Sequence, residues 1–293
     1  MKVIRAAVAA LLASCLSSVP AQAAIEYANN PAPGDAFTNA SGTNTGQDIA
    51  GSNWYYNNVR ANGVVGINST YARSGNGSVF MSTPAVASPG TTNGKADIEF
   101  YATAASNAAG NFNATSILGS LGQLSSLSYE WYRDSSSTNS AAQHPSLRLQ
   151  VIDPISNAFG YLVFERVYNS LATPVGSWTA DDVFGGDYRM WSTGNLPSSF
   201  VTVGSRKLSN WMADFPNYAV LGVSSGVGSG WGQFTGAVDN ITFGFGTAPP
   251  TTYNFEVQAN GVVPEPHTIV VWSLLGVCGS LVACRARRDQ AVA

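Results

Sequence analysis

Charged side chains are scarce in this chain. Its 293 residues include 14 Lys and Arg and 17 Asp and Glu, so that only 11% of the residues are charged. Between residues 24 and 263 there are 9 basic and 15 acidic residues, an excess of six negative charges. A protein that binds the phosphates of nucleic acid needs a cluster of basic residues. The composition therefore argues against a nucleic-acid partner.

Cysteine is absent from the same segment. Cys15 lies in an N-terminal apolar run, and Cys278 and Cys284 lie in a C-terminal one. Residues 24–263 therefore have neither a disulfide nor a cysteine-ligated metal. A body of about 240 residues buries enough apolar surface to fold without such cross-links.

Residues that support catalysis are also few. His144 is the only histidine between residues 24 and 263, and we expect neither a nucleophile elbow nor a metal-binding His pair. A Ser-His-Asp triad around His144 would rest only on the presence of the three residue types. Glu130 and Glu165 lie on predicted strands and leave a secreted glycoside hydrolase open as an alternative, since that chemistry needs two carboxyl groups. Both glutamates are better explained as solvated strand positions, so we expect no enzyme.

The N-terminus has the three parts of a secretory signal peptide. Lys2 and Arg5 give a positive start, residues 6–16 are apolar, and an Ala-Gln-Ala cleavage site ends at Ala23. We expect residues 1–23 to be removed on export. Residues 12–15 also resemble a lipobox, which leaves lipidation of Cys15 open.

The C-terminus has a short motif, an apolar run and a basic cluster, in that order. They are Val263, Pro264, Glu265 and Pro266, then residues 268–284, then Arg285, Arg287 and Arg288. As a helix, the apolar run would extend about 25 Å at about 1.5 Å per residue, slightly less than a bilayer core of about 30 Å. The arginines place the C-terminal end in the cytoplasm. The tail therefore predicts a single transmembrane helix with the body outside.

This tail, residues 263–288, resembles the PEP-CTERM sorting signal of exported bacterial proteins. The resemblance implies processing near the motif by an exosortase, a membrane-embedded transpeptidase-like enzyme. It also implies delivery to the cell surface or to an exopolysaccharide matrix, as in a biofilm. The two prolines keep the backbone extended around Glu265, which suits recognition as an extended peptide. A plain membrane anchor is the alternative.

Period-two alternation of apolar and polar residues predicts an all-β body over residues 24–246, followed by a linker over 247–262. We expect a two-sheet antiparallel jelly-roll sandwich, with a concanavalin-A-like sandwich as the alternative topology. For residues 25–52 the sequence predicts a loop with one or two short strands, and residues 206–215 are the best candidate for a helix. The predicted strands are 77–81, 96–101, 127–133, 147–152, 160–168, 188–192, 218–224 and 236–245.

Residues 72–79 and 236–243 resemble an early strand and the closing strand of galactose-binding-like jelly rolls, a pair that many carbohydrate-binding modules share. The resemblance implies a structural Ca²⁺ at one edge of the sandwich. Its ligands would be Asp239 and backbone carbonyls near Gly75 and Ser78, because hard oxygen ligands suit this ion. A strand-end role for Asp239 without metal is the alternative.

Aromatic residues are frequent and suggest stacking on sugar rings, although sandwich cores also use them heavily. Trp231, which lies among glycines, is the best candidate for an exposed ring, followed by Trp54 and Tyr56. The wider set is Tyr55, Trp131, Tyr132, Trp178, Trp191 and Trp211. We therefore expect an exported surface or matrix protein with a non-catalytic interaction module. A polysaccharide-binding module with structural calcium is the main alternative.

Overall fold

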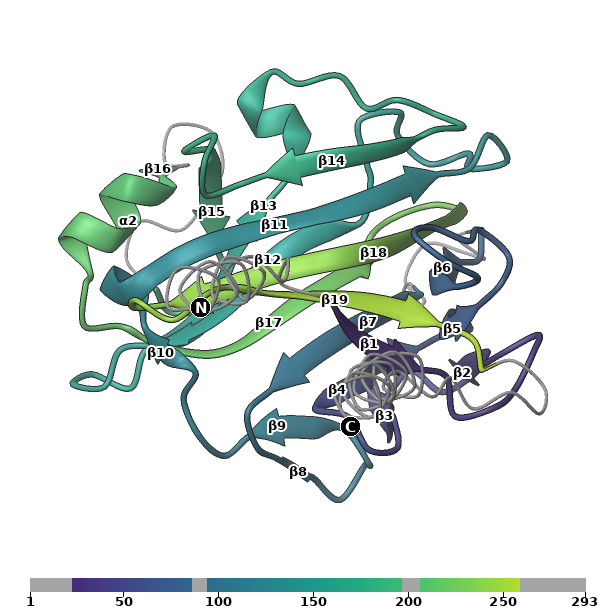
Figure 1. The fold of residues 1–293 in the computed structure, drawn as a ribbon, viewed down its shortest axis with the longest axis horizontal. Coiled ribbons are helices and arrows are strands. Elements are labelled where there is room, and N and C mark those ends of the chain that lie inside the picture. Colours follow the sequence, from purple (N-terminus) through teal and green to yellow (C-terminus); the bar gives the residue numbers. More distant parts are fainter. Residues whose placement is uncertain (1–22, 86–93, 197–205, 259–293) are drawn as a thin grey trace, which may run out of the picture. The chain divides into compact units, whose positions relative to one another are not determined.

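The computed structural model describes residues 23–85, 94–196 and 206–258 (Figure 1). The chain divides into two units, Met1–Val257 and Gln258–Ala293, and the helices and strands of the described residues belong to the first. Strands dominate this unit. Within the described part of this unit, the α-helix is α2 (Leu208–Asp214), and Leu121–Gln123 and Arg166–Asn169 form 3₁₀ turns.

Two large sheets and one hairpin account for the strands. The eight-stranded sheet contains β1 (Ala24–Tyr27), β2 (Phe37–Asn39), β5 (Gly63–Asn68), β6 (Ser78–Thr83), β11 (Leu124–Arg133), β14 (Trp178–Asp182), β18 (Phe234–Phe245) and β19 (Thr251–Glu256). The nine-stranded sheet contains β3 (Thr45–Asp48), β4 (Trp54–Arg60), β7 (Lys95–Tyr101), β10 (Gly119–Ser120), β12 (Ser146–Ile152), β13 (Phe159–Phe164), β15 (Arg189–Ser192), β16 (Arg206–Lys207) and β17 (Ala219–Val227). The hairpin pairs β8 (Ala104–Ser106) with β9 (Phe112–Ala114).

Among the described strands, the pairing is antiparallel except between β1 and β19. β1 runs parallel to β19, with Ala24 opposite Tyr253. In the nine-stranded sheet, the central order is β13-β12-β17-β7-β4, so β17 separates β12 from β7. This order decides which polar side chains meet on the sheet's outer face.

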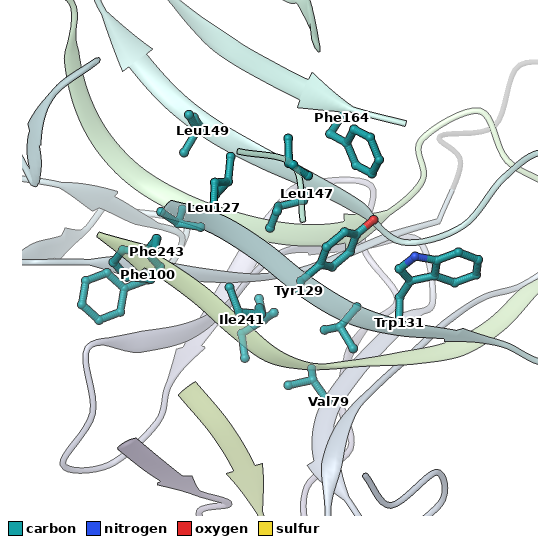
Figure 2. Packing of buried hydrophobic residues seen from close by; sticks show 14 of the residues in the cluster. Val79, Phe100, Leu127, Tyr129, Trp131, Leu147, Leu149, Phe164, Ile241 and Phe243 are labelled. Atoms are coloured by element: carbon teal, nitrogen blue, oxygen red, sulfur yellow. The ribbon is translucent and has the colours of Figure 1, made fainter. Parts of the chain in front are cut away.

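The two sheets pack face to face through apolar side chains that alternate along the strands. Figure 2 shows Leu127 and Tyr129 of β11 pointing toward Leu147 and Leu149 of β12, with Phe164 of β13 beside them. All five side chains are buried. The all-β prediction is confirmed as a mainly antiparallel sandwich.

Each predicted strand overlaps a strand of the structure, and the predicted helix 206–215 is found as α2. Residues 25–52 hold three short strands, β1 to β3, where one or two were expected. β13 ends at Phe164, and the residues after it form a 3₁₀ turn in place of the predicted strand end. The sandwich also continues beyond the predicted boundary at residue 246, because β19 pairs with both β18 and β1.

The described ranges contain no helix that is long and apolar enough to span a membrane. The predicted signal peptide, apart from Ala23, and the predicted transmembrane helix 268–284 lie outside the described residues. So do the sorting motif Val263–Pro266 and the basic cluster at residues 285–288.

Candidate functional site

A cavity of about 240 Å³ opens on the outer face of the nine-stranded sheet, away from the core. β12 and β13 supply its floor through the outward-facing positions of their alternating pattern, and β15 and the segment after β17 supply its walls. The lining residues are Lys95, Ser146, Arg148, Tyr161, Val163, Glu165, Trp191, Thr193, Gly228, Ser229 and Trp231. The cavity thus combines aromatic rings with charged groups.

A buried ion-pair network supports the floor. Arg148 of β12 donates from Nη1 to Oδ1 of Asp97 on β7, over 2.9 Å. Lys95 lies 2.9 Å from the other oxygen of the same carboxylate. Gly226 of β17 lies between these strands, and a Cβ there would be 1.8 Å from Oδ1 of Asp97. The glycine therefore lets the carboxylate extend across β17 to the arginine.

A second set of polar groups continues this network along β7. Glu99 is 1% exposed and accepts hydrogen bonds from Asn57 (2.5 Å), Asn58 (2.8 Å) and the hydroxyl of Tyr101 (2.5 Å). Burial raises the pKa of Glu99, and the nearby charge of Asp97 raises it further. A buried carboxyl group that is held by three donors fixes the side chains around it.

Gln150 links this network to the cavity. Its amide donates to the hydroxyl of Tyr161 over 2.9 Å and lies 3.4 Å from the hydroxyl of Tyr101. Gly222 of β17 makes this crossing possible, since a Cβ there would lie 2.6 Å from the Tyr101 ring. Tyr161 is thereby oriented where it lines the cavity.

The walls carry two indole rings. Trp231 packs edge-on against Phe234 with 5.6 Å between the ring centroids and is 8% exposed. Trp191 donates from Nε1 to Oε2 of Glu165 over 3.0 Å and packs edge-on against Tyr168. Burial raises the pKa of Glu165, while the hydrogen bond from Trp191 and the charge of Arg148 lower it.

Two of the predicted stacking residues are corrected by the structure. Trp54 and Tyr56 are completely buried, because their β4 positions face the other sheet. The Trp54 ring packs against Phe255, 5.1 Å between centroids. The hydroxyl of Tyr56 donates to Asp35 over 2.6 Å and accepts from the backbone N–H of Ile67. Both rings therefore belong to the core and present no face to a ligand.

Trp231 is less exposed than its glycine neighbours suggested, yet it lines the cavity. Tyr161 and Arg148 were not singled out from the sequence as binding residues. The sequence feature that could have identified them is that an aromatic and a charged residue occupy outward-facing positions of predicted strands. This feature does not show that the two side chains lie in the same cavity.

The catalytic alternatives gain no support from the geometry. Glu165 lines the cavity on the nine-stranded sheet, whereas Glu130 lies on β11 in the other sheet and pairs with Arg73 over 2.5 Å. His144 is 1% exposed, stacks on Trp131 with 4.6 Å between centroids, and accepts at Nε2 from the backbone N–H of Arg166. Burial lowers the pKa of His144 to about 3. The two glutamates therefore line different cavities and His144 is buried, so the three groups do not face a shared cleft.

A Gly-x-Ser-x-Gly motif is nevertheless present at Gly222–Gly226. A nucleophile elbow needs such a motif at a sharp turn between a strand and a helix. Here the motif lies inside β17, and Ser224 is 3% exposed. It is therefore part of the sheet that supports the cavity.

Asp239, the predicted calcium ligand, is fully buried on β18, between the part of this strand that pairs with β6 and the part that pairs with β19. Its Oδ1 accepts from the backbone N–H of Phe255 over 3.0 Å, and its Oδ2 has no hydrogen-bond partner in the described structure. Oδ1 of Asn254 is also buried and without such a partner. Burial, together with the charges of Glu256 and Glu130, raises the pKa of Asp239 to about 8, although hydrogen bonds from the backbone N–H groups of Phe255 and Asn240 oppose the rise.

The predicted carbonyl segment lies close to this group. Gly75 approaches the carboxylate of Glu256 so closely that a Cβ would lie 1.7 Å from Oε1. The hydroxyl of Ser78 donates to the carbonyl of Tyr71 over 2.6 Å. The described ranges hold no group of three or more His, Cys, Asp or Glu side chains that could bind a metal ion. An ion here would therefore also depend on amide and backbone oxygens.

No protein-family model matches the chain, and no curated protein matches it. Among solved structures, it is similar to the family 11 carbohydrate-binding module from Clostridium thermocellum, in complex with a β-1,3-1,4-mixed-linked tetrasaccharide. The match covers 73% of this chain and 98% of that module, with 11% identity and a TM-score of 0.30. So distant a likeness does not establish a function, which has to be inferred from the geometry of the chain itself.

Proposed function

We propose that this chain is an exported bacterial surface or matrix protein whose β-sandwich binds polysaccharide without cleaving it. The cavity on the nine-stranded sheet carries this proposal. It places the rings of Tyr161, Trp191 and Trp231 beside the charged groups of Arg148 and Glu165. Apolar ring faces pack on the C–H faces of sugars, and charged groups bind hydroxyls strongly.

The size of the cavity supports a small polar ligand. Its volume of about 240 Å³ is below the range of about 300–1,000 Å³ that is typical for drug-sized ligands. The cavity therefore suits about one sugar ring, with the rest of a polysaccharide outside it. The secreted-hydrolase alternative lacks a second carboxyl group in the same cavity, since Glu130 lies on the other sheet.

The sorting route remains a proposal that rests on the sequence. Residues 263–288 resemble a PEP-CTERM signal, so the partner that processes the chain would be an exosortase. The membrane helix would hold an intermediate until processing releases the body to the surface or matrix. β19 ends at Glu256, and the motif begins at Val263, so only a short segment separates the sandwich from the processing site.

We also propose a structural Ca²⁺ beside Asp239, as the resemblance to galactose-binding-like jelly rolls implies. The buried, unpartnered Oδ2 of Asp239 and Oδ1 of Asn254 support it, because orphaned buried oxygens are costly unless an ion or water binds them. Glu256 and backbone carbonyls near Gly75 and Ser78 would complete the oxygen set. Calcium added to EDTA-treated full chain should raise the melting temperature, as ligand binding to the folded state does. An unchanged melting temperature contradicts the proposal.

A glycan array with the full chain tests polysaccharide binding. Binding to at least one polysaccharide class is expected, with loss of that binding in the Trp231→Ala variant. Binding that persists in this variant would assign the ligand to another surface. Absence of binding to every glycan, with and without calcium, would contradict the proposed function.

A further inference from the structure

Fixed charges around the cavity cancel. Lys95 and Arg148 supply two positive charges, and both contact the single carboxylate of Asp97 at 2.9 Å. Glu165 supplies a second carboxyl group in the wall. Glu99 lies behind the floor of the cavity. Its carboxyl group is neutral or negative, so it does not add to the positive charge. The cavity therefore offers no net positive charge to an anionic ligand.

Hydrogen-bonding capacity remains on both sides of the cavity. Arg148 uses Nε for Ser146 (2.8 Å) and Nη1 for Asp97 (2.9 Å), and its Nη2 makes no hydrogen bond to the described residues. The side chain is 9% exposed and lines the cavity, so this nitrogen can donate to a ligand. Glu165 uses Oε2 for Trp191, which leaves Oε1 as an acceptor.

One donor and one acceptor in the same cavity match a sugar with neighbouring hydroxyl groups. Each hydroxyl can donate and accept, so one can bond to Glu165 while the next accepts from Arg148. The two residues are close enough for the charge of Arg148 to affect the carboxyl group of Glu165. Neither group is then left unpaired when the ligand displaces water.

A sugar carboxylate fits this arrangement poorly. It would enter beside Glu165, while the nearby cations already bind Asp97. Burying a charge without its own partner is costly. Residues 24–263 also carry 15 acidic against 9 basic residues, so the body as a whole repels polyanions during approach.

We propose that the cavity selects an uncharged sugar with vicinal hydroxyls and discriminates against uronic acids. Glu165 is the residue that sets this specificity, and Arg148 is its donor counterpart. The inference rests on the proposed polysaccharide-binding function and narrows its ligand class to neutral glycans.

Matched oligosaccharide pairs test this selection. Glucan against glucuronan, and mannan against mannuronan, differ only in oxidation at C6 of each sugar. Titration calorimetry with the full chain should show binding to a neutral member at least tenfold tighter than to its acidic partner. Glu165→Gln should narrow that gap at least threefold by improving uronan binding. Glu26→Gln, the same substitution on β1 of the other sheet, should leave the gap unchanged.

The outcomes separate this inference from the proposed function. Uronans that bind as tightly as neutral glycans, or more tightly, overturn the charge selection. If that binding is still lost in Trp231→Ala, the cavity remains the glycan site and only the selection is wrong. A gap that Glu165→Gln leaves unchanged also overturns the role of Glu165. Failure of both members of every pair to bind contradicts the inference and the proposed function together.

Discussion

Asp97 and Arg148 form a buried ion pair although their strands are not neighbours in the sheet. β17 lies between β7 and β12, and the 2.9 Å contact crosses it at Gly226. A missing side chain on the central strand is therefore as important to the cavity floor as the two charged residues. Breaking such a pair by moving one partner leaves an uncompensated buried charge.

Gly226→Ala should destabilise the protein by about 3 kcal/mol, the scale of a broken buried ion pair. The new Cβ would lie 1.8 Å from Oδ1 of Asp97, so the carboxylate must move away from Arg148. Urea unfolding measures the change. Gly232→Ala is the matched control, because its Cβ would lie 3.6 Å from the nearest atom. Equal effects at the two glycines would contradict the explanation.

Stability should fall in mild acid because of His144. Burial lowers its pKa to about 3 in the folded protein, against an ordinary value of 6.5. Between these values the unfolded chain binds a proton that the folded protein does not, so the free energy of unfolding decreases as the pH falls. The loss reaches up to about 1.4 kcal/mol per pH unit.

Urea unfolding at several pH values, compared with His144→Gln, isolates this contribution. Between pH 6 and pH 4, the free energy of unfolding of the variant should decrease less steeply with falling pH than that of the wild type, because the variant lacks the histidine. His267→Gln changes the chain's other histidine, which lies outside the described residues, and should keep the wild-type slope. Identical slopes in wild type and His144→Gln would show that His144 does not carry the effect.

Asp239→Asn should separate calcium binding from folding. The amide oxygen can still accept from the backbone N–H of Phe255, so the melting temperature in EDTA should stay within a few degrees of the wild type. The calcium-dependent rise should disappear, because a carboxylate ligand is lost. Asp48→Asn, at an exposed strand end, should keep the full rise. A rise that survives in Asp239→Asn would place the ion elsewhere.

The tail should be processed near residues 263–266 in cells that contain an exosortase. Mass spectrometry of the surface-exposed protein should find no peptides beyond the Pro-Glu-Pro motif. Replacing Pro264, Glu265 and Pro266 by alanine should retain the full-length chain in the membrane. Finding only the full-length tail on wild-type protein would contradict the sorting proposal.

Much of the fold could be predicted because apolar residues alternate with polar or small ones in the sequences of strands such as β7, β11 and β12. β11 alternates between buried and partly exposed positions along its length, and this pattern is visible in the sequence. β4 was missed because its aromatic and amide residues stand in consecutive runs, Trp54–Tyr56 and Asn57–Asn58, which interrupt the alternation. β5 was missed because Gly63 and Gly66 interrupt its apolar pattern. A periodicity argument thus misses a strand whose sequence lacks alternation, whereas β12 was predicted although nearly all of it is buried.

The site was only partly predictable for a related reason. Trp54 and Trp231 are equally suited to stacking by residue type, and only the tertiary structure places one in the core and the other at a cavity. Arg148 occupies an outward position of a predicted strand, but its pairing with Asp97 depends on strand order. Local patterns do not encode which strands become neighbours.

Affinity of the Trp231→Ala variant for a glycan that binds the wild type tests the central claim most directly. The account predicts at least a tenfold loss by titration calorimetry, because Trp231 supplies a wall of the cavity. Trp178→Ala removes an indole from β14 of the other sheet, and this control should bind like the wild type. Unchanged binding in Trp231→Ala, or an equal loss in Trp178→Ala, would contradict the assignment of the cavity as the polysaccharide site.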